Sequence, residues 1–556
     1  MIISRHWNLL ARYGTLHRVN QVLPLLICVK GYRSTSEAQT LSYPDVFSWT
    51  SAIRSYSQNG RFKDALRLYV RMHSSPFRPN TFAISAALKA CARIPAKVSG
   101  TSIHAQIQKF GHEQDVYVQT ALVDLYSKLG DTGVARRVFD EMPVRNVVSW
   151  NSILFGYLRA GDLLGARKIF DEIPVKDVIS WNSMIAGYAR AGDMSQAESF
   201  FRQMPQTNVA SWNGMIGGYI LSGKVEAARK VFDEMPERSN VSWIEMISAY
   251  GKCGAVDSSR ELFEQMDDKD LASWNAMIAC YAQNSRPKEA ILLFKEMLKT
   301  GANIQPDEIT FVSILSACSQ LGDLKCGMWV ESYMSRIGIE LDDHLRTALV
   351  DLYAKCGSMQ KAYELFNSLR RQDLVSYSAM IMGCGINGRV SDAIHLFKKM
   401  VRAKISPNAI TFSGLLTAYN HAGMVDEGYR CFSSMMHEYQ VPPSADHYAI
   451  MVDLLGRSGM LEEAMSLINS MPLKPHAGVW GALLLACNMH CNVELGEIAT
   501  KHCIELETER ESSGYIILLA NIYASVGRWD DAKRLRMAVE EKGLDKTPGC
   551  SWLGPG

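Results

Sequence analysis

The chain repeats itself from Val46 onward, and this repetition limits its possible folds more than any other feature. Two adjacent copies show it: VVSWNSILFGYLRAGDLLGARKIFDEIPVKD, residues 147–177, is followed at once by VISWNSMIAGYARAGDMSQAESFFRQMPQTN, residues 178–208. A fixed period indicates stacked units, none of which can bury its apolar face alone. The sequence therefore predicts an all-α fold, an α-solenoid of tandem helical hairpins wound as a right-handed superhelix.

Each unit is expected to contain two helices of about 12 residues, or about 18 Å. In the copy at 147–177, Ser149 is expected to cap the first helix, in which apolar residues recur at helical spacing. Gly161 suits the turn that follows, Asp162 can cap the second helix and Pro174 can end it. The unit is thus predicted to be helix, tight turn, helix.

The repeats extend over most of the chain, with lengths that vary from 31 to 37 residues. We divide the array into units 46–80, 81–115, 116–146, 147–177, 178–208, 209–239, 240–270, 271–307, 308–342, 343–373, 374–408, 409–444 and 445–476. The first residue of each unit is called position 1, so that Asn151 stands at position 5.

Two positions in the unit carry small polar side chains that packing does not explain. They are position 5 and the last position, which pair as Thr50 and Asn80, Thr120 and Asn146, Asn151 and Asp177, Asn182 and Asn208, Asn213 and Ser239, Asn275 and Asp307, Thr347 and Asp373, and Ser378 and Asn408. Helix capping is the alternative explanation, and it suits the last position well. It suits position 5 poorly, because serines at position 3 such as Ser149 are expected to occupy the cap.

Position 13 adds a row of cations, and position 2 a row of apolar side chains. The cations are Lys128, Arg159, Arg190, Lys252 and Lys355, and the apolar residues include Phe47, Tyr117, Val148, Ile179 and Val375. Positions 5, 9 and 13 share one helix face, since they are four residues apart. An amide and a cation on one face suit a nucleobase edge and its phosphate. Solvated cations near a helix C-terminus are the alternative.

Composition restricts the possible functions. The net charge of +2 argues against a globally basic nucleic-acid-binding protein, so any polyanion site must be a local groove. Neither HxE nor PCxxC, the two strings of zinc deaminases, occurs in the sequence, and no other catalytic motif is evident. The cluster from Cys487 to Cys503 lacks zinc-ligand spacing. We therefore expect no enzyme, no metal and no cofactor.

The N-terminal segment differs from the repeats. Residues 1–44 contain five Arg or Lys residues and one acid, Glu37, with Ser and Thr clustered from Ser34 to Ser42. This composition is typical of an organelle transit peptide, predicted for residues 1–45, and a degenerate first repeat is the alternative. Because arginine and apolar residues dominate the first twenty positions, the mitochondrion is favoured, with the plastid as the alternative.

The motifs SWNSMIAGYARAG, ALVDLYAKCG and TFVSILSAC closely resemble those of plant pentatricopeptide repeat proteins of the PLS subgroup. That resemblance implies binding of single-stranded RNA, one base per repeat, with position 5 and the last position as the code. Carried over, the code implies A for the pairs at Thr50, Thr120 and Ser378, G at Thr347, U at Asn151 and Asn275, and a pyrimidine at Asn182 and Asn213. The unit 308–342, with Val312 at position 5, is among those left unassigned.

The tail resembles the E1 and E2 motifs of organelle RNA-editing factors, through GVWGALLLAC, YIILLANIYASVGRW and PGCSW. The resemblance implies a repeat array at 46–476, E1 at 477–514 and E2 at 515–556. It also implies a site-recognition factor for C-to-U editing that recruits a deaminase in trans, with a deaminase-bearing pentatricopeptide repeat protein and multiple-organelle editing factors as partners. An RNA stability or splicing factor and a protein-binding scaffold are the alternatives. Neither a membrane nor DNA is expected as a partner.

Overall fold

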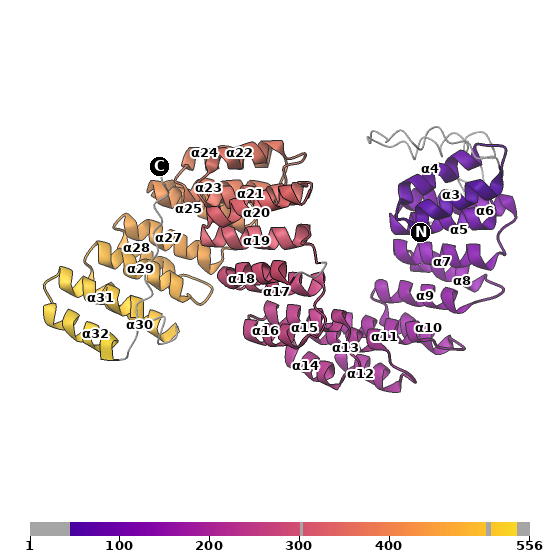
Figure 1. Ribbon diagram of the computed structural model, residues 1–556, viewed down its shortest axis with the longest axis horizontal. Coiled ribbons are helices and arrows are strands. Elements are labelled where there is room, and N and C mark those ends of the chain that lie inside the picture. The colour runs from indigo at the N-terminus through magenta and orange to yellow at the C-terminus, as the bar shows by residue number, and fades with distance from the viewer. Residues whose placement is uncertain (1–44, 301–303, 507–512, 542–556) are drawn as a thin grey trace. The chain divides into compact units, whose positions relative to one another are not determined.

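The structure is a computed structural model that describes residues 45–300, 304–506 and 513–541 (Figure 1). Its described part is helical and contains no strand. The chain separates into two compact units, which we call unit 1 and unit 2, with the boundary between Tyr250 and Gly251. The predicted all-α solenoid of helical hairpins is confirmed. The predicted transit peptide at residues 1–45 lies almost wholly outside the described residues.

Helices with odd labels are the first helices of the repeats, and those with even labels are the second helices. In unit 1 they are α3 (Val46–Gln58), α4 (Phe62–His73), α5 (Thr81–Arg93), α6 (Lys97–Phe110), α7 (Val116–Leu129), α8 (Thr132–Asp140), α9 (Val147–Arg159), α10 (Leu163–Glu172), α11 (Val178–Arg190), α12 (Met194–Gln203), α13 (Val209–Leu221), α14 (Val225–Glu234) and α15 (Asn240–Lys252), the last two residues of α15 belonging to unit 2.

Unit 2 continues the alternation. Its helices are α16 (Val256–Gln265), α17 (Leu271–Gln283), α18 (Pro287–Lys299), α19 (Glu308–Leu321), α20 (Leu324–Arg336), α21 (Asp343–Lys355), α22 (Met359–Ser368), α23 (Leu374–Ile386), α24 (Val390–Arg402), α25 (Ala409–Ala422), α26 (Val425–His437), α27 (Ala445–Arg457), α28 (Leu461–Asn469), α29 (Ala477–Met489), α30 (Val493–Leu506), α31 (Ser513–Ser525) and α32 (Trp529–Glu541). Every first helix of the array begins at position 1 of its predicted unit.

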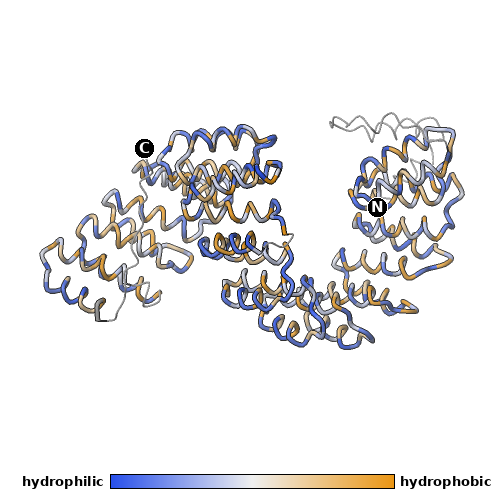
Figure 2. The backbone as a smooth tube through the Cα atoms, in the orientation of Figure 1, coloured by the Kyte–Doolittle hydropathy of each residue, from blue (hydrophilic) through white to orange (hydrophobic). Residues whose placement is uncertain are grey.

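The first helices stack side by side. In unit 1 the row runs from α3 to α13, and in unit 2 it runs from α17 to α31 (Figure 1). The second helices from α4 to α12 and from α18 to α30 each contact the first helix of their own repeat and that of the next, as α12 does with α11 and α13. Figure 2 shows apolar and polar residues alternating along the same helices, as expected for amphipathic helices that bury one face.

Glycines allow the first helices to approach one another closely. A Cβ atom at Gly187 in α11 would lie 2.4 Å from Cδ2 of Leu158 in α9, and one at Gly383 in α23 would lie 2.3 Å from Cβ of Ala354 in α21. Both distances are shorter than a contact between two carbon atoms, so an alanine at Gly187 or at Gly383 would require the neighbouring atoms to move.

Aromatic pairs join one repeat to the next. The Trp181 ring at position 4 of α11 meets Phe170 of the preceding α10 edge to face, with ring centroids 4.9 Å apart, and Trp150 meets Phe139 in the same way at 4.7 Å. Lys176, in the loop between them, lies over the Phe170 ring. Such edge-to-face pairs add stability beyond the burial of their apolar area.

The caps correct one prediction. The N-cap of α9 is Asn146, whose side chain accepts a hydrogen bond from the Ser149 backbone, so Ser149 lies inside the helix and the predicted serine cap is wrong. Because the backbone of Asn146 is extended, its side-chain Oδ1 can accept from the Ser149 amide at 2.8 Å, whereas Ser149 is already helical and cannot act as the cap. Asp162 caps α10, and Gly161 has a φ of 78°, both as predicted.

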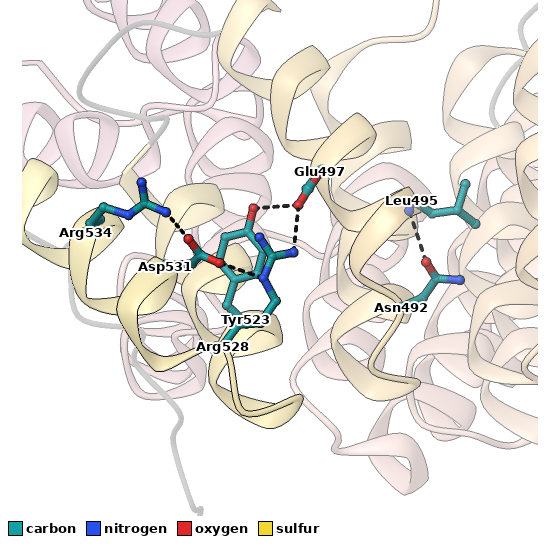
Figure 3. A network of polar contacts seen from close by, with 7 residues as sticks. All are labelled: Asn492, Leu495, Glu497, Tyr523, Arg528, Asp531 and Arg534. Carbon is teal, nitrogen blue, oxygen red and sulfur yellow. Dashed lines mark hydrogen bonds and ion pairs between the residues drawn. The ribbon is translucent and has the colours of Figure 1, made fainter.

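Polar contacts link the last two hairpins, α29 with α30 and α31 with α32 (Figure 3). The Tyr523 hydroxyl donates to Glu497 of α30 at 2.7 Å, and Arg528 reaches the same carboxylate at 3.5 Å. Arg528 also pairs with Asp531 at 2.6 Å, and Asp531 pairs with Arg534. Within the described residues, the tail is thus attached to the array as further hairpins.

Candidate nucleic-acid interface

In most repeats the side chain of the last residue caps the first helix of the next one. Oδ1 of Asp177 accepts from the Ser180 backbone at 2.8 Å, and Oδ1 of Asn208 accepts from the Ser211 backbone at 3.0 Å. The other caps of this kind are Asn80, Asp115, Asn146, Asp270, Asp307, Asp342, Asp373, Asn408 and His476. Capping at the last position is therefore confirmed, and any role in recognition is additional to it.

Position 5 lies past the first turn of the first helix, where it cannot act as a cap, and its asparagines reach the last residue of the same repeat. Asn151 Nδ2 donates to both carboxylate oxygens of Asp177 at 3.1 Å. Asn275 Nδ2 donates to Oδ1 of Asp307 at 2.9 Å. The structure brings these two pairs together across neighbouring first helices.

Other position-5 residues are less strongly joined to the last position. Asn182 Nδ2 lies 3.5 Å from Oδ1 of Asn208, and the Ser378 hydroxyl lies 3.5 Å from Oδ1 of Asn408. The Thr50 hydroxyl donates within its own helix to the Val46 carbonyl at 2.7 Å and lies 3.2 Å from Oδ1 of Asn80.

Two threonines bond only within their own helices. The Thr120 and Thr347 hydroxyls donate to carbonyls four residues earlier, at 2.6 and 2.7 Å. Among the described contacts, neither bonds to its partner at the last position, Asn146 or Asp373. The Thr120 and Thr347 hydroxyls thus keep a free acceptor oxygen, whereas Asn151 and Asn275 join neighbouring first helices.

The hydroxyl at position 3 connects the pair, a role that the sequence reasoning missed. The Ser180 hydroxyl lies 2.8 Å from Oδ1 of Asn151 and 2.7 Å from Oδ1 of Asp177. Thr310 repeats this arrangement, at 2.6 Å from Oδ1 of Asn275 and 2.9 Å from Oδ1 of Asp307. The recurrence of Ser and Thr at position 3 was the available signal, and it was interpreted as capping.

Where the last residue is neutral, the asparagine at position 5 is less constrained. The Oδ1 atoms of Asn182 and Asn213 are buried and have no hydrogen-bond partner among the described residues. At Asn182, the next hydroxyl, Ser211, bonds Asn208 instead. An unpaired buried acceptor costs free energy, which a donor from a bound ligand would recover.

The two carboxylates of the bonded pairs are held in the ionised form. Burial raises the pKa of Asp177, but hydrogen bonds from the Ser180 hydroxyl and backbone and from Asn151 outweigh it, so the pKa is lowered. Burial also raises the pKa of Asp307, but hydrogen bonds from Thr310 and Asn275 outweigh it, so this pKa is lowered as well. At neutral pH both carboxylates are therefore ionised and can only accept hydrogen bonds.

Burial differs between the pairs. Asn275 is 7% exposed and Thr50 is 6% exposed, because the neighbouring first helix covers them. Asn151, Asn182, Asn213, Thr120 and Thr347 are half-buried. The position-5 side chains thus lie at the seam between first helices and not in the apolar core, and those of Asn151 and Asn275 reach the next N-cap.

The apolar residues of position 2 project into solvent. Phe47 is 81% exposed and Tyr117 is 70% exposed, and Val148, Ile179 and Val375 are similarly open. Most other large apolar side chains in these first helices are buried. A regularly spaced row of exposed apolar groups beside the polar pairs is the arrangement that stacking against bases requires.

The position-13 cations fall into two groups. Lys128 pairs with Asp124 at 2.7 Å, and Lys355 pairs with Asp351 at 3.0 Å, in each case with position 9 of the same helix. Arg159, Arg190 and Lys252 are exposed and form no ion pair within the part of the chain that the structure describes. Only the second group is free to contact a phosphate.

Family models match most of the chain. The model of the PPR repeat family matches residues 44–93, 269–320 and 372–421, and that of the PPR repeat matches residues 120–147, 148–178, 179–209, 210–240, 241–271, 346–374, 410–438 and 446–474. The E motif model matches residues 490–554. The matches and the helical hairpins agree with one another repeat by repeat.

Relatives in Arabidopsis thaliana are similar over nearly the whole chain. Pentatricopeptide repeat-containing protein At4g22760 is 56% identical over 92% of this chain and 88% of its own length. The mitochondrial protein At2g22410 is 39% identical over 91% and 76%, and the chloroplastic protein At1g08070 is 39% identical over 96% and 74%. The chain belongs to the pentatricopeptide repeat family of plants and carries the E motif of its E subclass.

Proposed function

We propose that this protein binds single-stranded RNA in register, one nucleotide per repeat, and that it selects the site of C-to-U editing in an organelle transcript. The observation that carries the proposal is the coincidence, along the row of first helices in unit 1, of three features. These are polar pairs at position 5 and the last position, exposed apolar side chains at position 2, and free cations at position 13. Together they provide base-edge readers, stacking groups and phosphate contacts.

The hydrogen-bonding states of the pairs are consistent with the implied bases. In Asn151 and Asn275 the amide oxygen is occupied, and the neighbouring carboxylate can accept only, so one amide N–H remains for a keto oxygen of uracil. In Asn182 and Asn213 the amide oxygen has no partner, and cytosine offers an amino donor. This difference supports assigning U to the first two and a pyrimidine to the second two.

The C-terminal region supports the editing role. We propose that residues 477–514 and 515–556 act as the E1 and E2 motifs and recruit a deaminase-bearing pentatricopeptide repeat protein and editing factors in trans. The match of residues 490–554 to the E motif model supports this assignment. In the same proposal the array spans 46–476 with the PLS alternation of lengths, and the chain itself performs no catalysis.

The proposed compartment is an organelle. The basic, acid-poor composition of residues 1–45 supports import. Relatives named mitochondrial and chloroplastic share the same identity with this chain, so they support an organelle without separating the two. We favour the mitochondrion, on the arginine-rich start. A fluorescent protein fused after residue 45 should accumulate there in plant cells, and accumulation in plastids would select the other compartment.

The proposed function is tested by gel-shift binding. Purified residues 46–556 would be titrated against an RNA carrying 5′-A n A U Y Y n U n G A n n and against the same bases scrambled. Tight, salt-sensitive binding to the first RNA alone is expected. Equal binding to both would reduce the pairs to helix caps, and binding to neither would favour a protein-binding scaffold.

A further inference from the structure

Unit 2 contains a hollow at repeat 308–342, to which the code assigns no base. The hollow has a volume of about 360 Å³ and lies between α17 and α19, lined among others by Ala279, Ala282, Gln283, Val312, Ser316 and Gln320. Val312 occupies position 5 of repeat 308–342 and has no hydrogen-bonding group to offer a base. The volume lies near the lower end of the range for small-molecule sites, about 300 Å³.

The hollow exists because small residues line up. Ala279 and Ser316 stand at position 9 of adjacent repeats, and Ala282 stands at position 12. In α9, by contrast, position 9 is Phe155, an exposed aromatic side chain that would fill such a space. Position 9 is also small at Ala186 and Gly217, so small residues permit such an opening, and a large side chain at this position, as in repeat 147–177, would close it.

The lining selects a neutral ligand. The residues that border the hollow lie within the described part of the chain, and none of them is Asp, Glu, Lys or Arg. Such a lining neither neutralises a phosphate nor supplies the oxygen ligands of a hard metal ion. It offers apolar surface from Val312 and the alanines, with amides and hydroxyls at the edges. A nucleobase, which has apolar faces and a polar edge, matches this chemistry.

The amide of Gln320 is oriented by its contacts. Its Nε2 donates to the Ala282 carbonyl at 2.9 Å and lies 3.4 Å from the Ser316 hydroxyl oxygen. The carbonyl oxygen of an amide could not bond another carbonyl, so the orientation follows from chemistry. The group left to a ligand is Oε1, an acceptor, on a side chain that is exposed.

We infer that the nucleotide facing repeat 308–342 places its base in this hollow, against Val312, and that Gln320 at position 13 reads it. This inference rests on the proposed function, and it assigns the reading to position 13 where position 5 is apolar. An acceptor at Oε1 pairs with the amino groups of cytosine and adenine and opposes the keto oxygens of uracil and guanine. The base between U and G in the predicted RNA is therefore C or A.

The test varies that single nucleotide. Residues 46–556 would be titrated against four otherwise identical RNAs with C, A, U or G between the predicted U and G, and against a fifth with an abasic nucleotide there. C and A should bind about threefold to tenfold more tightly than U and G, the worth of one neutral hydrogen bond. Gln320→Ala should abolish the difference among the four bases.

Two further variants make the result specific. Gln58→Ala changes another exposed glutamine at position 13, in the first repeat, and should leave the preference intact. Ser316→Phe fills the hollow and should bind the C and abasic RNAs equally, with folding checked by circular dichroism. If the predicted RNA is preferred over the scrambled one while all four bases bind equally, this inference is wrong and the proposed function stands. If no RNA is preferred, the proposed function itself fails.

Discussion

The repeats at 147–208 in unit 1 and those at 343–408 in unit 2 have the same hairpin but use position 13 differently. In the first region Arg159 and Arg190 follow Phe155 and Ala186 at position 9, and both arginines are exposed and unpaired among the described residues. In the second region Lys355 is bound by Asp351.

The carboxylate in unit 2 also joins two repeats. Asp351 accepts from the Ser319 hydroxyl of the preceding first helix at 2.6 Å. Asp453 does the same with Asn420 at 2.6 Å. The comparison teaches that the residue at position 9 decides the role of a cation at position 13. Where position 9 is a carboxylate, the cation is part of a structural link, and where it is not, the cation is a candidate phosphate contact.

The largest expected difference between the two regions comes from substituting the glycines at which neighbouring first helices are in close contact. A methyl group at Gly383 would meet the Cβ and Cα atoms of Ala354, which cannot move independently of the backbone, whereas one at Gly187 would meet the flexible end of Leu158. Gly383→Ala should therefore lower the free energy of unfolding by about 1–3 kcal/mol. Gly187→Ala should cost less, and equal losses in urea unfolding would contradict the rigid contact proposed for unit 2.

The caps give the next largest effect. Asp177→Ala removes an N-cap and leaves the Asn151 amide and the Ser180 hydroxyl without an acceptor, so a loss of about 1–2 kcal/mol is expected. Asp373→Ala removes a cap whose position-5 partner, Thr347, bonds within its own helix. Thermal unfolding should show the larger loss for Asp177, and the reverse order would argue against coupling between repeats.

The cations test the RNA-binding half of the comparison. Arg159→Ala combined with Arg190→Ala should weaken RNA binding roughly tenfold at moderate salt and lower the salt slope by about 1.4, or about 0.7 per lost phosphate contact. Lys128→Ala combined with Lys355→Ala removes the same charge from paired sites and should change the slope little. Similar slopes for both double variants would show that pairing does not matter.

The smallest effect is a pH dependence. Because the folded pKa of Asp177 lies below its unfolded value of about 3.9, its contribution to stability is present above that value and is lost as pH falls through the folded pKa. Asp177→Asn should bond as a cap like Asn208 yet lose this part of the acid dependence. Unfolding midpoints between pH 5 and pH 2 that ran parallel for both proteins would exclude the ionised pair.

Much of the fold could be predicted because the repeat fixes it. The 31-residue period, the turn glycine Gly161 and the cap Asp162 are local signals, and the first helices begin at the predicted repeat boundaries. Capping at the last position was recognised, but the cap predicted at Ser149 was wrong, because Ser149 and Asn146 are both good capping residues and only the backbone geometry distinguishes them.

The candidate site could be predicted only in part. The recurrence of position 5 and the last position was visible in the sequence, but burial was not: Asn275 and Asn151 occupy the same position and differ in exposure through their neighbours on the next helix. The pairing of Lys355 was within reach, since Asp351 stands four residues earlier. The hollow beside Gln320 depends on two neighbouring helices, α17 and α19, and has no signature in any one repeat.

The most direct test of base reading by position 5 and the last position is a change of code. Asn275→Thr combined with Asp307→Asn reproduces the pair Thr50 and Asn80 while keeping a capping side chain on α19. Binding would be measured to RNAs with U or A facing repeat 271–307, and the unchanged pair Asn151 and Asp177 serves as the internal control. The account predicts that the preference moves from U to A at that nucleotide alone. A folded variant that binds RNA and still prefers U would contradict it.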